Sequence, residues 1–303
     1  MRLLPHWASP YPRQHLGSDV LAGIIVTILV IPQSLAYALL AGLPPQIGLY
    51  VSIFPVIAYA LFGSSMVQAV GPVAITSIMT YSVLAPIAAP GSPEYLVLAA
   101  TLALGSGLLL LACGLLRLGF LAQLLSRPVI AGFISGSAVL IVFSQLKYLF
   151  GMTPAGSDAW HVISALFTQG RIDAGTLIGL TAIAVLAFSR LGLAGLLGKI
   201  GLKPASTAMI VRLVPLFVVL AGTAAVIGWN LDHRHGVAVV GSIVEGLPGL
   251  NLFLPAFAEL KLLALPILLM ALIGMVQNIS MAQALAIRRR ERIDANAELV
   301  GLG

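Results

Sequence analysis

The sequence predicts an all-α polytopic membrane protein, and three observations support that prediction. Of the 303 residues, 59% are hydrophobic and only 9% are charged, whereas a soluble globular domain carries about a quarter charged residues. Mean hydropathy is +1.06. Apolar runs recur along most of the chain, and each is close to the ~20 residues that a helix needs to cross a bilayer.

Hydrophobic segments separated by short polar, Gly-containing or Pro-containing stretches are expected to form the membrane helices. Their ranges are 20–40, 47–62, 73–88, 95–116, 128–150, 174–189, 209–229 and 262–287. An amphipathic piece, LRLGFLAQLLSR, precedes the fifth segment. We expect it to lie along the membrane interface with Arg117 and Arg127 at the headgroups. A further Gly-rich helix is expected to begin at Leu299.

The distribution of Lys and Arg predicts the orientation in the membrane. With the N-terminus inside, residues 1–19 are cytoplasmic and residues 230–261 form an extracytoplasmic loop. Of the 16 Lys and Arg residues, only four then lie outside: Lys147, Arg171, Arg234 and Lys261. Because positive residues concentrate in cytoplasmic loops, the sequence predicts a multi-pass protein of the cell or inner membrane with a cytoplasmic N-terminus.

Several function classes receive no support from the sequence. It has no basic, aromatic-interleaved patch typical of nucleic-acid partners, and no nucleophile elbow, P-loop or dinucleotide motif of an enzyme or a cofactor site. His233 and His235 are more typical of a solvated loop than of a metal site. All ten Asp and Glu residues lie at segment ends or in loops, so no carboxylate is expected deep within a helix.

Polar residues in the first segment are candidates for a site inside the membrane. Gln33 and Tyr37 are four apart and share a helix face. Pro32 removes one backbone hydrogen bond beside them. Polar groups in hydrocarbon usually face the protein interior or a water-filled path. The alternative is a proline kink with a hydrogen bond between helices.

The third segment begins after a break at Gly71 and Pro72 and barely has the length to span a bilayer. If the residues before the break are extended, the helix that starts at Val73 has its N-terminus near mid-membrane. Its unpaired N–H groups and the positive end of its dipole could then bind an anion without Lys or Arg. Broken helices build substrate sites in many transporters. The alternative is an ordinary helix start.

The eighth segment carries a third polar pattern. Gln277 and Ser280 are three apart and share a face, whereas Asn278 points elsewhere. Adjacent amides in mid-membrane are costly unless other groups satisfy them. They either contribute to a site or join two helices by hydrogen bonds.

Four stretches of the sequence resemble one known family. They are IPQSLAYALLAGLPPQIGLYVSIFP, GPVAITSIM, LSRPVIAGFISGSAVLIVFSQLKYLFG and IDANAELVGLG. In order and spacing they are similar to the SulP anion transporters, the family of sulfate permeases and prestin. The resemblance covers nearly the whole chain.

The resemblance implies a fold of seven plus seven helices in inverted repeats, with a core domain and a gate domain. Residues 20–229 would form the first repeat, and residues 262–303 would form helix eight and the start of helix nine. The short third helix would start near mid-membrane. Full-length members are expected to be homodimers in contact with membrane lipid. The residues that would line an anion site are Gln33, Tyr37, Val73, Ala74, Gln277 and Ser280.

The sequence departs from this family in two ways. It stops as the ninth helix starts, so the later helices and the STAS domain are expected to be missing. The family usually has Glu where Gln277 stands, which predicts no proton coupling through that position. The function expected is alternating-access transport of sulfate, bicarbonate, chloride or a dicarboxylate. The alternatives are a truncated, non-transporting fragment that needs a partner chain, or an anion channel on the same fold.

Overall fold

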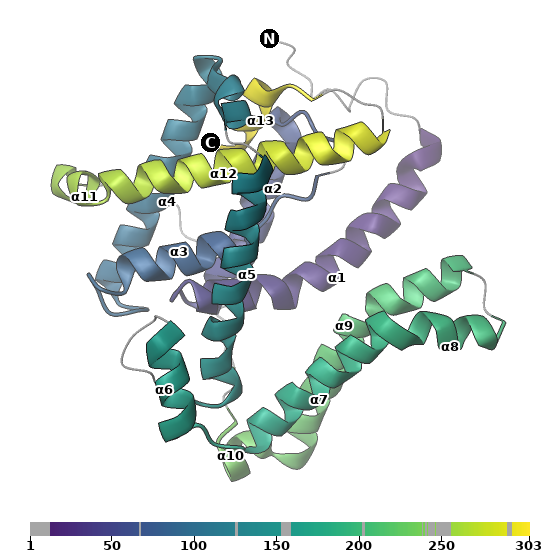
Figure 1. The fold of residues 1–303 in the computed structure, drawn as a ribbon. Coiled ribbons are helices and arrows are strands. Elements are labelled where there is room, and N and C mark those ends of the chain that lie inside the picture. Colours follow the sequence, from purple (N-terminus) through teal and green to yellow (C-terminus); the bar gives the residue numbers. More distant parts are fainter. Residues whose placement is uncertain are drawn as a thin grey trace. The chain divides into compact units, whose positions relative to one another are not determined.

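The computed structural model describes residues 13–66, 68–124, 127–152, 159–201, 204–237, 239, 241, 246, 256–289 and 293–303. Helices make up most of these residues, and the described part of the chain has no strand (Figure 1). The elements in order are η1 (Arg13–His15), α1 (Leu16–Leu40), α2 (Pro45–Phe62), α3 (Ala74–Leu84), α4 (Pro93–Leu115), η2 (Leu118–Leu124), α5 (Arg127–Leu149), α6 (Ala159–Gln169), α7 (Ala174–Phe188), η3 (Ser189–Leu193), α8 (Ala194–Lys199), α9 (Pro204–Trp229), α10 (Leu231–His235), α11 (Phe257–Leu262), α12 (Ala264–Arg289) and α13 (Ala295–Leu302).

All eight predicted hydrophobic segments are helical, which confirms the all-α prediction. The third is shorter than expected, because α3 ends at Leu84 rather than at residue 88. The last helix begins at Ala295 rather than at Leu299, because the Asp294 carboxylate caps it by accepting from the backbone N–H groups of Asn296 and Ala297. The short helices α6, α10 and α11 were not predicted.

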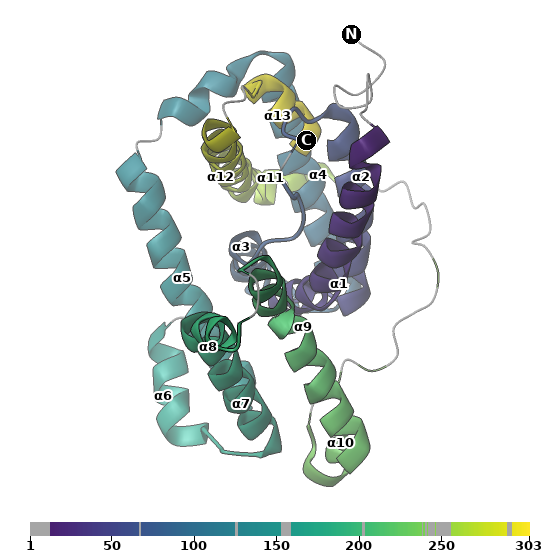
Figure 2. The same ribbon diagram turned by 90° about the vertical axis from the view of Figure 1, so that its right-hand side faces the viewer.

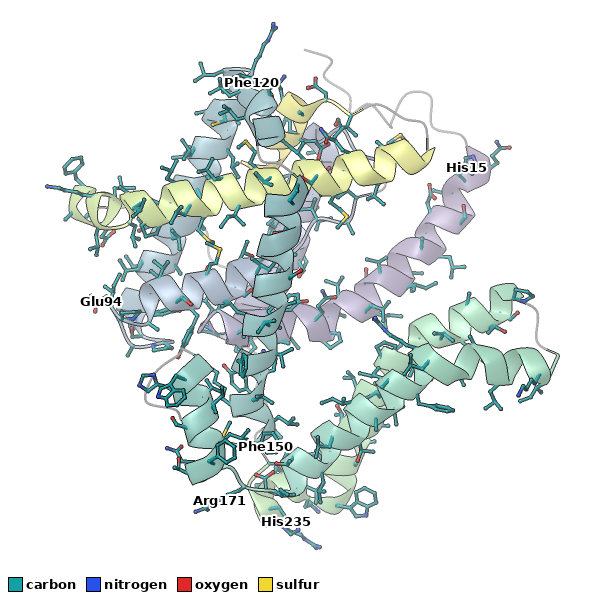
Figure 3. All side chains as sticks on the ribbon, in the orientation of Figure 1. His15, Glu94, Phe120, Phe150, Arg171 and His235 are labelled. Carbon is teal, nitrogen blue, oxygen red and sulfur yellow. The ribbon has the colours of Figure 1, made fainter. Side chains whose placement is uncertain are left out.

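Within the part of the chain that the structure describes, five helices are long and apolar enough to cross a membrane. They are Leu16–Leu40, Pro45–Phe62, Pro93–Leu115, Ala174–Lys199 and Ala264–Gln283. Large apolar side chains on several helices are exposed, as membrane-facing surfaces require; Leu191, for example, is 89% exposed. Figure 3 shows the labelled residues His15, Glu94, Arg171 and His235 at helix ends. The protein is therefore an integral, multi-pass membrane protein.

The chain divides into two compact units. Unit 1 comprises Met1–Ile25, Gln33–Ser137 and Ile243–Gly303, and unit 2 comprises Val26–Pro32 and Ala138–Ser242. Unit 1 therefore joins the helices α2, α3 and α4 to α11, α12 and α13, which lie near the other end of the sequence.

Two hydrophobic clusters hold unit 1 together. One joins α3 and α4 to the start of α12 through Leu84, Tyr95, Leu102, Leu263 and Ile267. The other joins α4, α12 and α13 through Leu110, Ala271, Met275, Ile279 and Leu299. Figure 2 shows α12 and α13 beside α4 and α2. Helices from both ends of the sequence thus pack together in unit 1.

Glycines allow α13 to approach its neighbours closely. A Cβ at Gly301 would lie 2.8 Å from the backbone nitrogen of Gly63, which follows α2. A Cβ at Gly107 of α4 would lie 3.0 Å from the carbonyl oxygen of Gly303. Small residues at such contacts let helix backbones pack tightly in membranes. This packing holds α13 against the end of α2.

The end of α1 is anchored on α4. Tyr95 is wholly buried, and its hydroxyl donates to the Ala41 carbonyl oxygen at 2.6 Å. Gly42 follows with a φ of +75°, and a Cβ there would lie 2.7 Å from the Tyr95 hydroxyl oxygen. The Gly42 carbonyl in turn accepts from the Gly91 N–H at 3.0 Å. This turn fixes where α1 ends relative to α3 and α4.

We expect Tyr95→Phe to destabilise the protein by about 1–2 kcal/mol, because it removes the hydroxyl donor from the carbonyl of a buried residue, Ala41. Thermal unfolding of the purified protein in detergent measures the change. Tyr148→Phe is the matched control, since that side chain is 54% exposed. Equal unfolding temperatures for wild type and Tyr95→Phe would contradict the anchoring role of this hydroxyl.

Unit 2 is held together by a small hydrophobic cluster, by hydrogen bonds and by the packing of two helices. Met152, Val162 and Ala165 form a buried cluster that packs α6 against the end of α5. The Thr176 hydroxyl donates to the Leu149 carbonyl at 2.9 Å, which joins α7 to α5. Asp173 caps α7, and the backbone N–H of Thr176 lowers the pKa of its carboxyl below the ordinary value. Helix α7 packs on α9.

Candidate functional site

The segment between α2 and α3 breaks the helical run in unit 1. This α2–α3 segment (residues 63–73) is non-helical at every described residue, and its two ends, Gly63 and Val73, have extended backbones. Gly71 and Pro72 precede the helix, as predicted. Val73 is the N-cap of α3 and Ala74 is its first residue.

The N-terminus of α3 presents backbone donors. No side chain caps it, and the first intrahelical bond runs from the Ser77 N–H to the Val73 carbonyl at 3.1 Å. The N–H groups of Ala74, Ile75 and Thr76 therefore have no partner within the helix. They lie at the positive end of the helix dipole. This arrangement can accept an anion without help from a charged side chain.

The length of α3 is that of a half-membrane helix. Its 11 residues extend ~16 Å at ~1.5 Å per residue, about half of the ~30 Å hydrocarbon thickness. The sequence has no Lys or Arg between Arg13 and Arg117. Anion binding here would therefore depend on neutral hydrogen-bond donors and on the helix dipole.

Gln33 and Tyr37 lie together on α1. The Gln33 amide Nε2 donates to the Tyr37 hydroxyl oxygen at 3.2 Å, which confirms that the two side chains share a face. Next to them, a Cβ at Gly48 would lie 2.1 Å from the Ser34 carbonyl oxygen, so α1 and α2 are in backbone contact at this level. Close packing thus fixes the turn of α1 that carries the pair.

Gln277 and Ser280 lie on α12, which packs against α3. Both side chains are partly buried, and neither forms a hydrogen bond to another described residue. Asn278 points elsewhere, as expected, and is only 9% exposed. Its amide is hydrogen-bonded to polar groups of α13 and the α2–α3 segment.

The six predicted residues all belong to unit 1, on α1, α12 and the start of α3. The structure brings Gln33 and Tyr37 together and packs the helix of Gln277 and Ser280 on α3. Among the described residues, no hydrogen bond joins the three sets. That they surround one anion stays a proposal.

Sequence reasoning missed one carboxylate, which lies at a helix end, as expected, but is buried inside the helical core. Glu298 of α13 is 0% exposed. Its Oε1 accepts from the Ser64 N–H (2.9 Å), the Ser64 hydroxyl (2.6 Å) and the Ser65 N–H (2.8 Å). Its Oε2 accepts from the Tyr59 hydroxyl (2.6 Å) and the Asn278 amide (3.3 Å). We call these five residues the carboxylate cluster.

The position of Glu298 in the sequence gives no indication that its side chain is buried. Glu298 lies in the first turn of α13, where acidic residues commonly interact favourably with the helix dipole and face water. Glu298 is buried because Gly63 and Gly301, which have no side chains, let the end of α2 pack directly against α13. A signal was available in the run Gly63-Ser64-Ser65, whose small polar residues and backbone N–H groups are suited to hold an anion.

The fold and the broken helix define a polytopic membrane protein with a half-length helix that follows a non-helical segment, a class to which many transporters belong. The sequence pattern of the Sulfate permease family matches residues 16–303. The chain therefore belongs to the sulfate permease family.

Individual relatives agree with this assignment. A probable sulfate transporter of Mycobacterium tuberculosis is 39% identical over 294 residues, which is 97% of this chain and 50% of the relative. Probable sulfate transporter 4.2 of Arabidopsis thaliana is 35% identical over 98% of this chain and 43% of its own length. Solute carrier family 26 member 6 of Homo sapiens is 33% identical over 98% of this chain. The chain spans about half the length of the curated relatives it matches.

Solved structures share the fold. The chain superposes on a structure of SLC26A9 with a TM-score of 0.84 and 27% identity, covering 99% of this chain and 48% of the other. The transmembrane domain of BicA, a cyanobacterial bicarbonate transporter, gives a TM-score of 0.77 at 24% identity, over 99% of this chain and 72% of that domain. The predicted family and fold are confirmed.

Proposed function

We propose that the protein carries out secondary transport of a small anion by alternating access, and that this chain supplies part of the anion site. The observation that carries the proposal is the uncapped N-terminus of α3, which ends a non-helical segment in a stretch without Lys or Arg. Membership of the sulfate permease family supports the same function.

The proposed site uses neutral donors from three elements. Backbone N–H groups at Ala74 and its neighbours would face the anion, with the Val73 side chain beside it. Gln33 and Tyr37 would donate from α1, and Gln277 and Ser280 from α12. Neutral donors bind an anion without trapping it as a buried Arg or Lys could, which suits a site that must release its substrate.

Sulfate, bicarbonate, chloride and dicarboxylates are all proposed as candidate substrates. The relatives in Mycobacterium tuberculosis and Arabidopsis thaliana are named as sulfate transporters, and BicA as a bicarbonate transporter. We also propose the cytoplasmic N-terminus, the division of the chain into a first repeat (20–229) and the start of a second (262–303), and a homodimer. Because Gln277 carries no titratable proton, no proton coupling is proposed through that position.

Uptake into proteoliposomes tests this function. The purified protein is reconstituted and offered radiolabelled sulfate, bicarbonate, chloride and oxalate in turn. The proposal expects saturable uptake of at least one anion, accelerated by the same anion on the opposite side. A non-saturating, ohmic anion current would favour a channel on this fold. Flux of none of these anions would favour a fragment that requires a partner chain.

We expect Gln33→Ala to raise the KM for the transported anion about tenfold or more, because a hydrogen bond to a charged group contributes about 1.5–3 kcal/mol. Initial uptake rates across a range of anion concentrations measure the change. Gln14→Ala, the same substitution in η1, is the control and should leave KM unaltered. An unchanged KM in a well-expressed Gln33→Ala protein would assign Gln33 to helix packing alone.

A further inference from the structure

The carboxylate cluster is directly attached to the segment that leads to the proposed site. Three of the five hydrogen bonds to Glu298 come from Ser64 and Ser65, at the beginning of the α2–α3 segment. The Ser64 hydroxyl also receives a hydrogen bond from the Asp294 N–H at 3.1 Å. The start of α13 therefore holds the start of this segment through both backbone and side-chain groups.

A second attachment lies four residues further along. The Gln68 amide Nε2 donates to the Asn278 Oδ1. The Asn278 Nδ2 donates to Glu298 Oε2 at 3.3 Å. An ionised carboxylate only accepts hydrogen bonds, so Asn278 must turn its NH₂ group toward Glu298. Its oxygen then faces Gln68, which must in turn present its own NH₂ group.

In this geometry, the Glu298 side chain holds the α2–α3 segment at two places. Glu298 holds Ser64 and Ser65 directly and holds Gln68 through the orientation of Asn278. Gln68 stands five residues before Val73, with Gly71 and Pro72 between them. Hydrogen bonds with an ionised acceptor are about twice as strong as neutral ones, so the charge on Glu298 strengthens both attachments.

We propose that Glu298 is a positioning residue, which acts through Ser64, Ser65, Asn278 and Gln68 to hold the N-terminus of α3 where the anion binds. The inference rests on the proposed function, since the anion is the substrate proposed above. Glu298 does not touch the anion in this account. The residue places backbone donors, whose N–H groups bind only if the helix starts at the right position.

Glu298→Gln tests the proposal because the new amide keeps the shape and removes the charge. It also places an NH₂ group where only donors face the side chain. Amide hydrogen exchange of peptides that cover residues 63–73 should rise about tenfold, because the anchoring bonds weaken. The KM for sulfate uptake should rise about tenfold with Vmax within about threefold, because the change affects binding in particular.

The double variant Glu298→Gln/Asn278→Asp provides the rescue. The carboxylate moves to position 278, where it can accept from the amide at position 298 and from Gln68. The carbonyl oxygen at position 298 still accepts from Ser64 and Ser65. We expect exchange and KM to return to within about threefold of wild type. If Glu298 had only a structural role, Glu298→Gln would lower Vmax because less protein would fold. Moving the carboxylate to position 278 would then not restore KM.

Ser64→Ala and Ser52→Ala keep the test decisive if Glu298→Gln fails to fold. The Ser64 hydroxyl bonds to Glu298, whereas the Ser52 hydroxyl bonds to the Gly48 carbonyl of its own helix. Ser64→Ala alone should raise exchange and KM, by about threefold. Unchanged exchange in residues 63–73 of both Glu298→Gln and Ser64→Ala, or a double variant without rescue, would overturn the proposal. If the wild type takes up none of the panel anions, the proposed function fails, whereas the exchange rates still decide whether Glu298 holds this segment.

Discussion

Val73→Trp is expected to reduce the initial rate of anion uptake at least about 100-fold, while Val73→Ala retains most of it. Val73 is the N-cap of α3, and its partly buried side chain lies beside the backbone N–H groups proposed to bind the anion. An indole there would occupy the space of the anion. Alanine changes neither the backbone donors nor the dipole, so only the apolar contact is lost.

Uptake by reconstituted protein, normalised to the amount of folded transporter, measures both variants. Val139→Trp is the matched control, because that valine is 55% exposed on α5 and belongs to unit 2. It should transport at the wild-type rate. If Val73→Trp transports as well as Val139→Trp, the anion does not pass the N-terminus of α3.

Gly48→Ala is expected to destabilise the protein by about 2–3 kcal/mol, a typical cost of an overpacked contact. The added Cβ would lie 2.1 Å from the Ser34 carbonyl oxygen and 2.7 Å from its carbonyl carbon. These are backbone atoms, so the contact is relieved only by separating α1 from α2. Separation would also shift Gln33 and Tyr37, and uptake should fall together with stability.

Gly23→Ala is the control for the effect of the same substitution on stability where the helix has open space. Gly23 also lies within a membrane helix, but a Cβ there would meet no atom within 4 Å. In open space Ala favours a helix over Gly by about 1 kcal/mol, so Gly23→Ala should leave the unfolding temperature unchanged or raise it. A Gly48→Ala protein that unfolds at or above the wild-type temperature would show that the two helices are not in backbone contact.

The predicted helices were found because membrane crossing imposes strong local rules. A long apolar run must be helical to satisfy its backbone in lipid, and Gly71-Pro72 must interrupt it. The Gln33–Tyr37 pair followed from helical spacing alone. The amphipathic α6 was missed because its 11 residues, AWHVISALFTQ, are neither long nor apolar enough to give a membrane signal.

The carboxylate cluster could not be predicted by the same reasoning. Glu298 and Ser64 are 234 positions apart, and only the packing of α13 on α2 brings them together. Local sequence assigns Glu298 to the first turn of a helix, a position usually open to water. The family resemblance indicated the start of α3 as an anion contact but gave no partner for Glu298. Long-range packing of small residues, which leaves little trace in a single sequence, decides its surroundings.

Protection of a cysteine at position 73 by the substrate tests whether the anion binds at the N-terminus of α3. Val73→Cys is introduced into a Cys113→Ala background, which removes the lone native cysteine. The labelling rate by a water-soluble thiol reagent is measured as the concentration of the transported anion increases. We predict that labelling slows, with half of the effect reached at the KM for uptake, whereas labelling of Trp229→Cys, at an exposed position of unit 2, does not change. Labelling of position 73 at an unchanged rate under saturating anion would contradict the claim that the anion binds at the N-terminus of α3.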